Sequence, residues 1–265
     1  MDPESSPIIV RRERLEGGVV GYVTFNEPAR LNALSTARMT AFVEAMGALS
    51  AESELRAVVL RGSGERAFIG GADIDEMAAL NGPLAARAFI LRVHACCQAV
   101  RECPVPVIAA VHGFCLGAGL ELAAACDLRL ASEDARLGMP EVRLGLPSVV
   151  EAALLPQLVG WGQARRLVYL GETLDAAEAL RIGLVEAVVP RDRLEARLTA
   201  WLQALLEAGP QAIRAQKALV RRWEALTPDR AIAAGVDTFE SSFAEEEPGR
   251  MLAAFQAQRR ARRKG

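Results

Sequence analysis

Apolar positions in the first sixty residues follow two different periods. Runs rich in β-branched residues cover 8–14 and 19–25 with two glycines between them, so this segment predicts a β-hairpin. Over 39–49 the apolar residues recur at three- and four-residue spacing, which predicts a helix that Ser35 is placed to cap. A short apolar run at 57–60 predicts a buried strand after this helix.

Strands and helices alternate through the middle of the chain. A helical stretch is expected to reach about Glu102, prolines bracket an apolar strand at 105–111, a helix begins near Gly117, and 127–132 predicts another strand. Such alternation indicates an α/β fold with crossover connections.

Beyond about Pro190 the pattern becomes helical only. The expected helices cover 194–206, 212–223, 231–243 and 249–263. We therefore predict two parts, an α/β core over residues 1–195 and a helical region over residues 196–265.

The composition is that of a globular protein. Of 265 residues, 51% are hydrophobic and 24% charged, and the net charge of -2 supplies no general attraction for nucleic acid. The longest apolar stretches are far too short to span a bilayer, so no membrane partner is expected, and no metal site is predicted. Five cysteines without paired spacing, and no cationic leader with an apolar segment, indicate reduced thiols in a cytoplasmic protein.

Two glycine-rich motifs leave backbone amides free to bind a ligand. In AFIGGADIDEM, Gly70 and Gly71 let the backbone bend sharply, which leaves the amide of Ala72 without an evident secondary-structure partner. In VHGFCLGAGLELAAACD, a helix beginning at 117–119 leaves its first amides without intrahelical acceptors, and the helix dipole adds positive potential there. Such a helix start favours an anion or a developing oxyanion, although a glycine pair alone more often marks a simple turn.

Two glutamates stand in apolar surroundings. Glu121 lies in the first turn of that helix among leucines and alanines, and Glu141 follows Pro140 in a short irregular segment. Taken singly, Glu121 fits an ordinary helix-start glutamate and Glu141 an exposed loop glutamate. A buried carboxylate requires partners or a chemical role, and two carboxylates in different environments can divide acid and base roles. We therefore treat the pair as candidate catalytic residues.

Three motifs together resemble the enoyl-CoA hydratase/isomerase, or crotonase, superfamily. They are AFIGGADIDEM, VHGFCLGAGLELAAACDLRLAS and LGMPEVRLGLPS, and the similarity runs over nearly the whole chain, from RLNALS to AFQAQRR. The resemblance implies a crotonase-like spiral of ββα turns with a C-terminal helical trimerisation region, assembled as a homotrimer or a dimer of trimers. It also implies an acyl-CoA thioester substrate and no separate cofactor, because CoA is part of the substrate.

The resemblance also implies roles for individual residues. The amides of Ala72 and Ala118 would polarise the thioester oxygen, while Glu121 and Glu141 would hold one water and add it across the 2,3 double bond. Glu141 is expected to protonate C2 while Glu121 orients the water. The other expected contacts to substrate and CoA are Arg30, Leu31, Ala33, Gly71, Asp73, Ile74, Gly117 and Ser148.

The segment PSVVEAALLPQLVG departs from the glycine-rich run that many hydratases carry after the second glutamate. Ser148 stands where the family has a glycine whose amide helps to hold the water. Glu151 adds a third carboxylate, which we expect in the first turn of a helix that starts near Ser148. His94 and His112 are expected to have structural roles.

The leading hypothesis is syn addition of water to a 2-trans-enoyl-CoA, giving a 3-hydroxyacyl-CoA. The first alternative is an enoyl-CoA isomerase or another crotonase-type acyl-CoA chemistry, and the second is a non-catalytic CoA- or RNA-binding trimer. The presence of both Glu121 and Glu141 favours hydration, and the lack of interleaved basic and aromatic residues disfavours RNA. In the basic C-terminal run, Arg259 and Arg260 are candidates for contacts to CoA phosphates in a neighbouring subunit.

Overall fold

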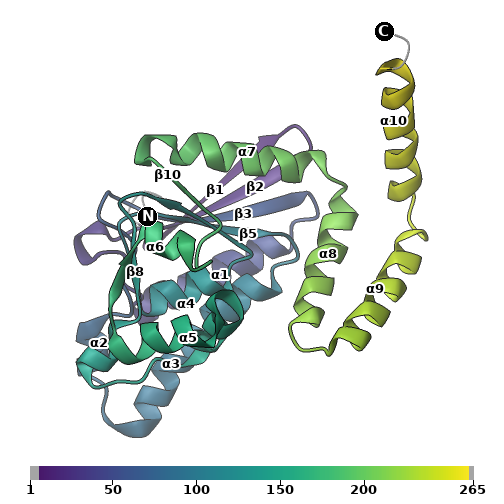
Figure 1. The fold of residues 1–265 in the computed structure, drawn as a ribbon. Helices are drawn as coiled ribbons and strands as arrows, with labels where there is room; N and C mark the ends of the chain where they lie inside the picture. The colour runs from purple at the N-terminus through teal and green to yellow at the C-terminus, as the bar shows by residue number, and fades with distance from the viewer. Residues whose placement is uncertain (1–5, 263–265) are drawn as a thin grey trace.

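Two β-sheets form the centre of the molecule (Figure 1), whose computed structural model describes residues 6–262. The larger sheet has the strand order β1-β2-β3-β5-β7-β10. β1 and β2 pair antiparallel as the predicted hairpin, and the remaining strands are added in parallel. The strands are β1 (Ile8–Leu15), β2 (Gly18–Phe25), β3 (Leu55–Gly62), β5 (Val107–Val111), β7 (Leu128–Ser132) and β10 (Ala187–Val189).

The smaller sheet is built from four three-residue strands. They are β4 (Ala67–Ile69), β6 (Phe114–Leu116), β8 (Arg136–Gly138) and β9 (Thr173–Asp175), in the order β4-β6-β8-β9. β4, β6 and β8 are parallel, and β9 closes the sheet antiparallel. Since β3, β5 and β7 of the larger sheet are each followed along the chain by β4, β6 and β8, the chain winds between the two sheets. Helices follow β4 and β6, so the predicted spiral of ββα turns is confirmed.

Helices cover both faces of the larger sheet. The helices of the core are α1 (Thr36–Ser50), α2 (Ile74–Ala78), α3 (Gly82–Glu102), α4 (Ala118–Ala125), α5 (Leu155–Leu170) and α6 (Ala176–Arg181). The main hydrophobic core includes the stacked rings of Phe25 and Phe42 together with Phe68 and Leu120, all fully buried. Ser35 caps α1 as predicted, accepting a hydrogen bond of 3.3 Å from the Arg38 amide.

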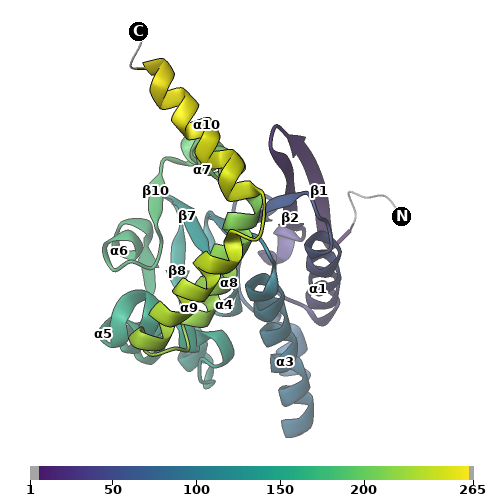
Figure 2. The same ribbon diagram turned by 90° about the vertical axis from the view of Figure 1, so that its right-hand side faces the viewer.

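The C-terminal third is helical, as predicted. It consists of α7 (Leu194–Glu207), α8 (Pro210–Trp223), α9 (Pro228–Ser242) and α10 (Glu247–Arg262). α7 lies across the larger sheet, where Leu198 and Leu202 pack against Val20 and Ile108. α8 and α9 lie beside the body of the molecule, and both views show α10 extending away from it (Figure 2). α7 spans the expected boundary between 195 and 196, and that division of the chain stays a prediction.

Several expected element limits were wrong. The helical stretch expected after AFIGGADIDEM is α3, which ends at Glu102 as expected but begins only at Gly82, and the strand expected from 105 begins at Val107 because Pro106 has no N–H for the sheet. α8 and α9 begin at Pro210 and Pro228, earlier than the apolar period indicates, since proline suits the first helical turn. The expected helix end at 263 lies outside the described residues.

Two further observations concern the described helices and the cysteine side chains. None of the helices in residues 6–262 combines the length and the apolar character that a membrane span requires. All five cysteines are buried and unbridged. Burial raises the pKa of the Cys96 thiol to about 12, so this thiol stays protonated at neutral pH and packs as a small core group.

Candidate active site

A small cavity lies where the start of α4, the turn after β4 and the segment after β8 meet. Its volume is about 140 Å³, and Ala72, Ala118, Glu121 and Glu141 all line it. The structure therefore brings together both amides and both glutamates singled out from the sequence. The apolar part of the wall includes Ile74, an expected contact, and Val149 of the segment that departs from the family. Its other side chains were not identified from the sequence, namely Met77, Phe89, Ile90, Val93, Leu144 and Leu146.

The two amides are placed by tightly packed backbone. Within residues 6–262 the Ala72 N–H has no backbone acceptor, although Gly71 and Asp73 on either side both bond to Leu34. Ala118 is the first residue of α4, so its N–H has no intrahelical acceptor either. A Cβ on Gly119 would stand 2.3 Å from the carbonyl oxygen of Ile69, so only glycine lets the start of α4 approach β4 this closely.

The α4 helix is held at its far end by Arg129. The guanidinium of this buried residue donates hydrogen bonds of 3.4 and 2.8 Å to the carbonyl oxygens of Ala123 and Cys126. A cation at the last carbonyls complements the helix dipole. The orientation of the Ala118 amide is therefore stabilised from both ends of the helix.

Glu121 is buried in the cavity wall, with 4% of its surface exposed. Its Oε1 accepts a hydrogen bond of 3.2 Å from the Ala152 amide. Burial and then the nearby negative charge of Glu141 raise the pKa of Glu121 to about 8, while the hydrogen bond from the Ala152 amide lowers it and Glu151 raises it by less. Glu121 therefore carries a proton at neutral pH.

Glu141 lies in the 3-10 helix η3 (Pro140–Leu144) and is half-buried. Its Oε2 accepts a hydrogen bond of 2.8 Å from the hydroxyl of Ser148, and its Oε1 lies against the α-carbon of Gly117. The expected role of Ser148 was to offer its amide to the water. In the structure the side chain of Ser148 makes the contact, and its hydroxyl orients the carboxylate of Glu141.

A second hollow of about 280 Å³ adjoins the first and shares Gly70, Ala72 and Ile74 with it. Most of the residues expected to contact CoA in the RLNALS and GGADI motifs line this hollow, namely Arg30, Leu31, Ala33, Asp73 and Ile74, and Arg66, not identified from the sequence, joins them. Gly71 lines the first cavity instead. Arg30 forms ion pairs with Asp73, at 3.1 Å, and with Asp75. Asp73 caps α2 by accepting hydrogen bonds of 3.1 Å from the amides of Asp75 and Glu76, so its side chain braces this loop.

Asn32 is a structural residue of the site that the sequence analysis missed. It is fully buried, with its backbone in the left-handed region at a φ of 56°. Its side chain donates hydrogen bonds of 3.0 and 2.9 Å to the carbonyl oxygens of Ser63 and Ala67, and accepts one of 2.9 Å from the Glu27 amide. Asn32 thus ties the RLNALS loop to the strand that leads to Ala72.

The third carboxylate lies in the first turn of a helix, although this helix begins later than expected. Glu151 belongs to the 3-10 helix η4 (Val150–Leu154), and it is buried rather than exposed. Its Oε1 lies 2.8 Å from Nδ1 of His94. His112 is the other histidine: burial lowers its pKa to about 4, and its Nε2 donates to the Gly64 carbonyl at 3.0 Å. The structural role expected of His112 agrees with this contact.

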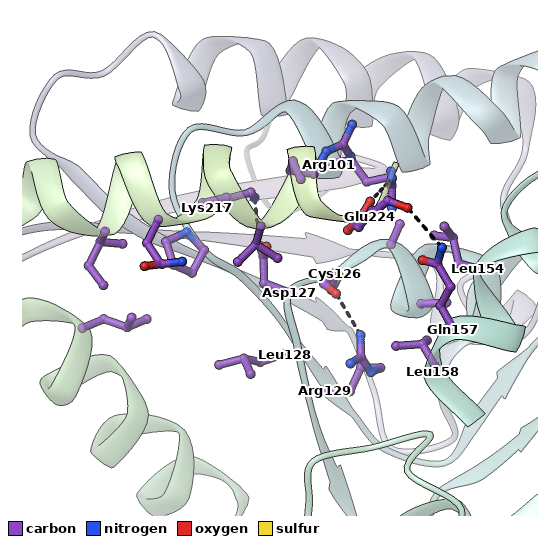
Figure 3. A pocket seen from close by; sticks show the side chains of 18 residues that line it. Arg101, Cys126, Asp127, Leu128, Arg129, Leu154, Gln157, Leu158, Lys217 and Glu224 are labelled. Atoms are coloured by element: carbon purple, nitrogen blue, oxygen red, sulfur yellow. Dashed lines mark hydrogen bonds and ion pairs between the residues drawn. The ribbon is translucent and has the colours of Figure 1, made fainter. Parts of the chain in front are cut away.

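A larger hollow of about 390 Å³ lies at the opposite end of α4, beside α8 (Figure 3). Its labelled charged residues pair with one another or with backbone carbonyls. Lys217 binds Asp127 at 2.8 Å, and Arg101 binds Glu224 at 2.6 Å. The Lys217 ammonium also donates to two carbonyl oxygens. These contacts hold α8 against the core. Within the described residues no set of His, Cys, Asp and Glu is arranged to hold a metal ion.

Comparison with known proteins gives consistent matches along the chain. The family described as enoyl-CoA hydratase/isomerase matches residues 16–264. The chain is 35% identical to the short-chain-enoyl-CoA hydratase of Clostridium acetobutylicum, covering 95% of each, and 35% identical to the crotonyl-CoA hydratase of Syntrophomonas wolfei, covering 89% of this chain and 91% of that one. The crystal structure of an enoyl-CoA hydratase from Bacillus anthracis superimposes with a TM-score of 0.90 at 30% identity, covering 96% of this chain and 97% of that one.

Proposed function

The chain belongs to the enoyl-CoA hydratase/isomerase family, and we propose that it is an enoyl-CoA hydratase, a hydro-lyase that converts a 2-trans-enoyl-CoA into a 3-hydroxyacyl-CoA. The observation that carries the proposal is the presence of Glu121 and Glu141 in one cavity with the Ala72 and Ala118 amides. The two amides alone would suit any reaction in which the thioester carbonyl is polarised, so they do not distinguish between these reactions. The two carboxylates add the acid and the base that addition of water requires.

The amides of Ala72 and Ala118 bind the thioester oxygen of the substrate. As water attacks C3, negative charge moves through the conjugated system onto this oxygen, and preorganised amides stabilise that charge without rearranging. One such donor is typically worth about 2.7–4 kcal/mol in the transition state. The dipole of α4 adds to the effect at Ala118.

The two glutamates work with a single proton between them. This proton resides on Glu121, the more buried of the two. During addition, the water oxygen bonds to C3, the pair takes up one water proton, and one proton passes from the pair to C2. The pair ends with the one proton with which it began. Delivery to C2 by Glu141, with Glu121 orienting the water, stays a prediction.

The substrate class proposed is a short acyl chain on CoA. The cavity beside Glu121 measures about 140 Å³, and Phe89, Ile90 and Val93 of α3 limit its depth. The matched relatives from C. acetobutylicum and S. wolfei carry names for short-chain and crotonyl substrates, which supports the same class. CoA would lie along the hollow lined by Arg30 and Arg66, whose guanidinium groups suit phosphate. No separate cofactor takes part in the proposed reaction.

The proposed assembly is a homotrimer or a dimer of trimers. Support comes from large apolar side chains exposed in the C-terminal helical region, among them Phe239 of α9, Phe243 directly after α9 and Phe255 of α10. Exposed apolar patches of this kind mark protein interfaces. Arg259 and Arg260 lie in the last turns of α10, and we propose that they contact CoA phosphates of a neighbouring subunit. The free, buried thiols support a cytoplasmic setting for the enzyme.

The test is hydration of crotonyl-CoA in oxygen-18 water, with the products analysed by mass spectrometry. The expected result is a 3-hydroxyacyl-CoA with the label on C3, and a Glu121→Gln, Glu141→Gln double variant as the control without label. A product with a shifted double bond and no oxygen-18 would show that the enzyme is an isomerase rather than a hydratase. Binding of CoA without any turnover over a panel of enoyl-CoAs would favour the non-catalytic alternative.

A further inference from the structure

Arg38 is a buried charge that the proposed chemistry does not use. It lies in the first turn of α1, and only 3% of its surface is exposed. Its Nη2 donates a hydrogen bond to the carboxylate of Glu27, but its Nε and Nη1 have no hydrogen-bond partner within residues 6–262. Buried donors are normally satisfied, so two unpartnered guanidinium nitrogens in the interior call for an explanation.

Stability alone does not favour arginine at this position. The positive end of the α1 dipole lies at its first turn, where a cation is unfavourable. A buried charge with unsatisfied donors also costs free energy that an apolar side chain of similar volume would avoid. The ion pair with Glu27 is therefore the feature of Arg38 that points to a role.

Glu27 begins the loop that carries the RLNALS motif. Its carbonyl oxygen accepts hydrogen bonds of 3.0 and 2.9 Å from the amides of Arg30 and Asn32, and its own amide donates to the Asn32 side chain at 2.9 Å. Leu31 and Asn32 in this loop both have left-handed backbone, at φ values of 55° and 56°, which residues with a Cβ adopt only where the surroundings impose it. The ion pair thus attaches a strained loop to the start of α1.

The same loop supports the backbone that leads to the Ala72 amide. The carbonyl oxygen of Leu31 accepts a hydrogen bond of 2.8 Å from the Gly70 amide, and the Leu34 amide donates to the Gly71 carbonyl oxygen at 2.8 Å. A Cβ on Gly70 would stand 2.8 Å from the Cβ of Leu31, so the two segments are in close contact. A displacement of the loop would therefore also displace the backbone before Ala72.

We propose that Arg38 is a positioning residue, which acts through Glu27 to hold the RLNALS loop where the Ala72 amide and the CoA hollow require it. The loop lines that hollow as well as supporting the amide. An apolar side chain in place of Arg38 would fill the same space but could not bind the Glu27 carboxylate. The effect on turnover rests on the proposed hydration, whereas the attachment of the loop does not.

The test compares kinetics with thermal unfolding in Arg38→Met, which fills the buried space and removes the donors. With crotonyl-CoA, kcat per folded molecule should fall about tenfold or more and KM should rise, because a misplacement of about 1 Å can cost about a hundredfold. The melting temperature should stay the same or rise, since the Glu27 carboxylate left behind is 41% exposed and becomes solvated. A residue that only stabilised the fold would show the opposite pattern. Arg38→Lys keeps the charge and should retain most of the activity.

Arg56→Met is the matched control, because Arg56 is a buried arginine that lines neither hollow of the site. It donates hydrogen bonds of 2.8 and 2.7 Å to the carbonyl oxygens of Leu205 and Ala208, so its loss should lower the melting temperature and leave kcat of the folded protein unchanged. Wild-type kcat in folded Arg38→Met would overturn the proposal. Should that variant not fold, the Glu27→Gln, Arg38→Met double variant leaves no unpaired charge and should show the same loss. Wild-type kcat in the double variant would equally overturn the proposal.

Hydrogen exchange of the substrate-free protein separates this inference from the proposed function. The amides of Asn32 and Gly70 should exchange about tenfold faster in Arg38→Met than in the wild-type protein, because the loop that Glu27 anchors supplies both acceptors. Amides of β5 should exchange at unchanged rates. Equal rates at Asn32 and Gly70 in the two proteins would contradict the anchoring. Faster exchange, together with no hydratase activity of the wild type on a panel of enoyl-CoAs, would support the role of Arg38 and refute the proposed function.

Discussion

The carboxylate of Glu141 lies directly against the α-carbon of Gly117. Any side chain at position 117 would collide with Oε1 of Glu141. Gly117 also has a φ of 51° with a ψ of -123°, a conformation that residues with a Cβ rarely adopt. The glycine before the Ala118 amide therefore serves two purposes, turning the chain into α4 and leaving room for the second carboxylate.

Gly117→Ala should lower kcat/KM by about a hundredfold or more, since it displaces Glu141 and tilts the Ala118 amide, and the loss of one oxyanion donor typically costs about 10²–10³. Steady-state kinetics with crotonyl-CoA measure this effect. The matched control is Gly47→Ala in α1, where an added Cβ meets nothing within 4 Å. Equal activity of Gly117→Ala and the control would contradict the placement of the site.

Glu121→Gln and Glu141→Gln should each reduce kcat by about 10²–10⁴, the usual contribution of a positioned acid or base. Binding of a 3-hydroxyacyl-CoA, measured by calorimetry, should survive in both variants, because the amides and the CoA hollow are untouched. Wild-type turnover in either variant would remove that glutamate from the mechanism.

Glu121→Gln should also stabilise the protein, increasingly so as the pH rises from about 4.5 to about 8. The folded-state pKa of Glu121 is raised to about 8 from 4.5, so the folded protein binds more protons than the unfolded chain within this window. The contribution of Glu121 to stability is therefore fully present below about pH 4.5 and lost as the pH rises through about 8. The variant avoids that loss. Thermal unfolding at pH 5 and pH 9 should show a larger advantage for the variant at pH 9, and a constant difference would contradict the raised pKa.

Ser148→Ala should lower kcat/KM roughly tenfold to a hundredfold, since a hydrogen bond to a charged group contributes about 1.5–3 kcal/mol. The bond concerned is the 2.8 Å contact from the Ser148 hydroxyl to Glu141. Ser148→Thr keeps the hydroxyl and should retain most of the activity. If the two variants lose the same activity, the backbone at this position, rather than the hydroxyl, carries the effect.

Glu247→Ala should loosen the C-terminal helices. Buried Glu247 at the start of α10 accepts hydrogen bonds of 3.0 and 2.9 Å from the amides of Gln211 and Ala212, in the first turn of α8. Removing this acceptor leaves those amides unsatisfied, at a cost of about 1–3 kcal/mol. Hydrogen exchange should accelerate at both amides, whereas Glu246→Ala, an exposed neighbour, should have no such effect. Unchanged exchange in Glu247→Ala would show that α10 does not cap α8.

Much of the larger sheet and most helices were predictable because their signals are local. The pattern that predicts each element lies within the element itself. This holds for the β1–β2 hairpin, for the capped helix α1 and for the apolar strand β3. The smaller sheet was not predicted, because its strands have three residues each, and strands so short form only when neighbours already stand beside them. The early starts of α8 and α9 were missed for another reason, namely that proline begins a helix without contributing to the apolar pattern.

The sequence by itself determined which atoms of the site are available: two amides beside glycines, and glutamates among apolar residues. Only the tertiary structure decided how these groups affect each other. The contact of Glu141 with Gly117, the burial of Glu151 against His94 and the proton on Glu121 all depend on packing between elements far apart in the chain. The reason is physical, since hydrogen bonds, desolvation and charge repulsion depend on distance in space, whereas sequence patterns record distance along the chain.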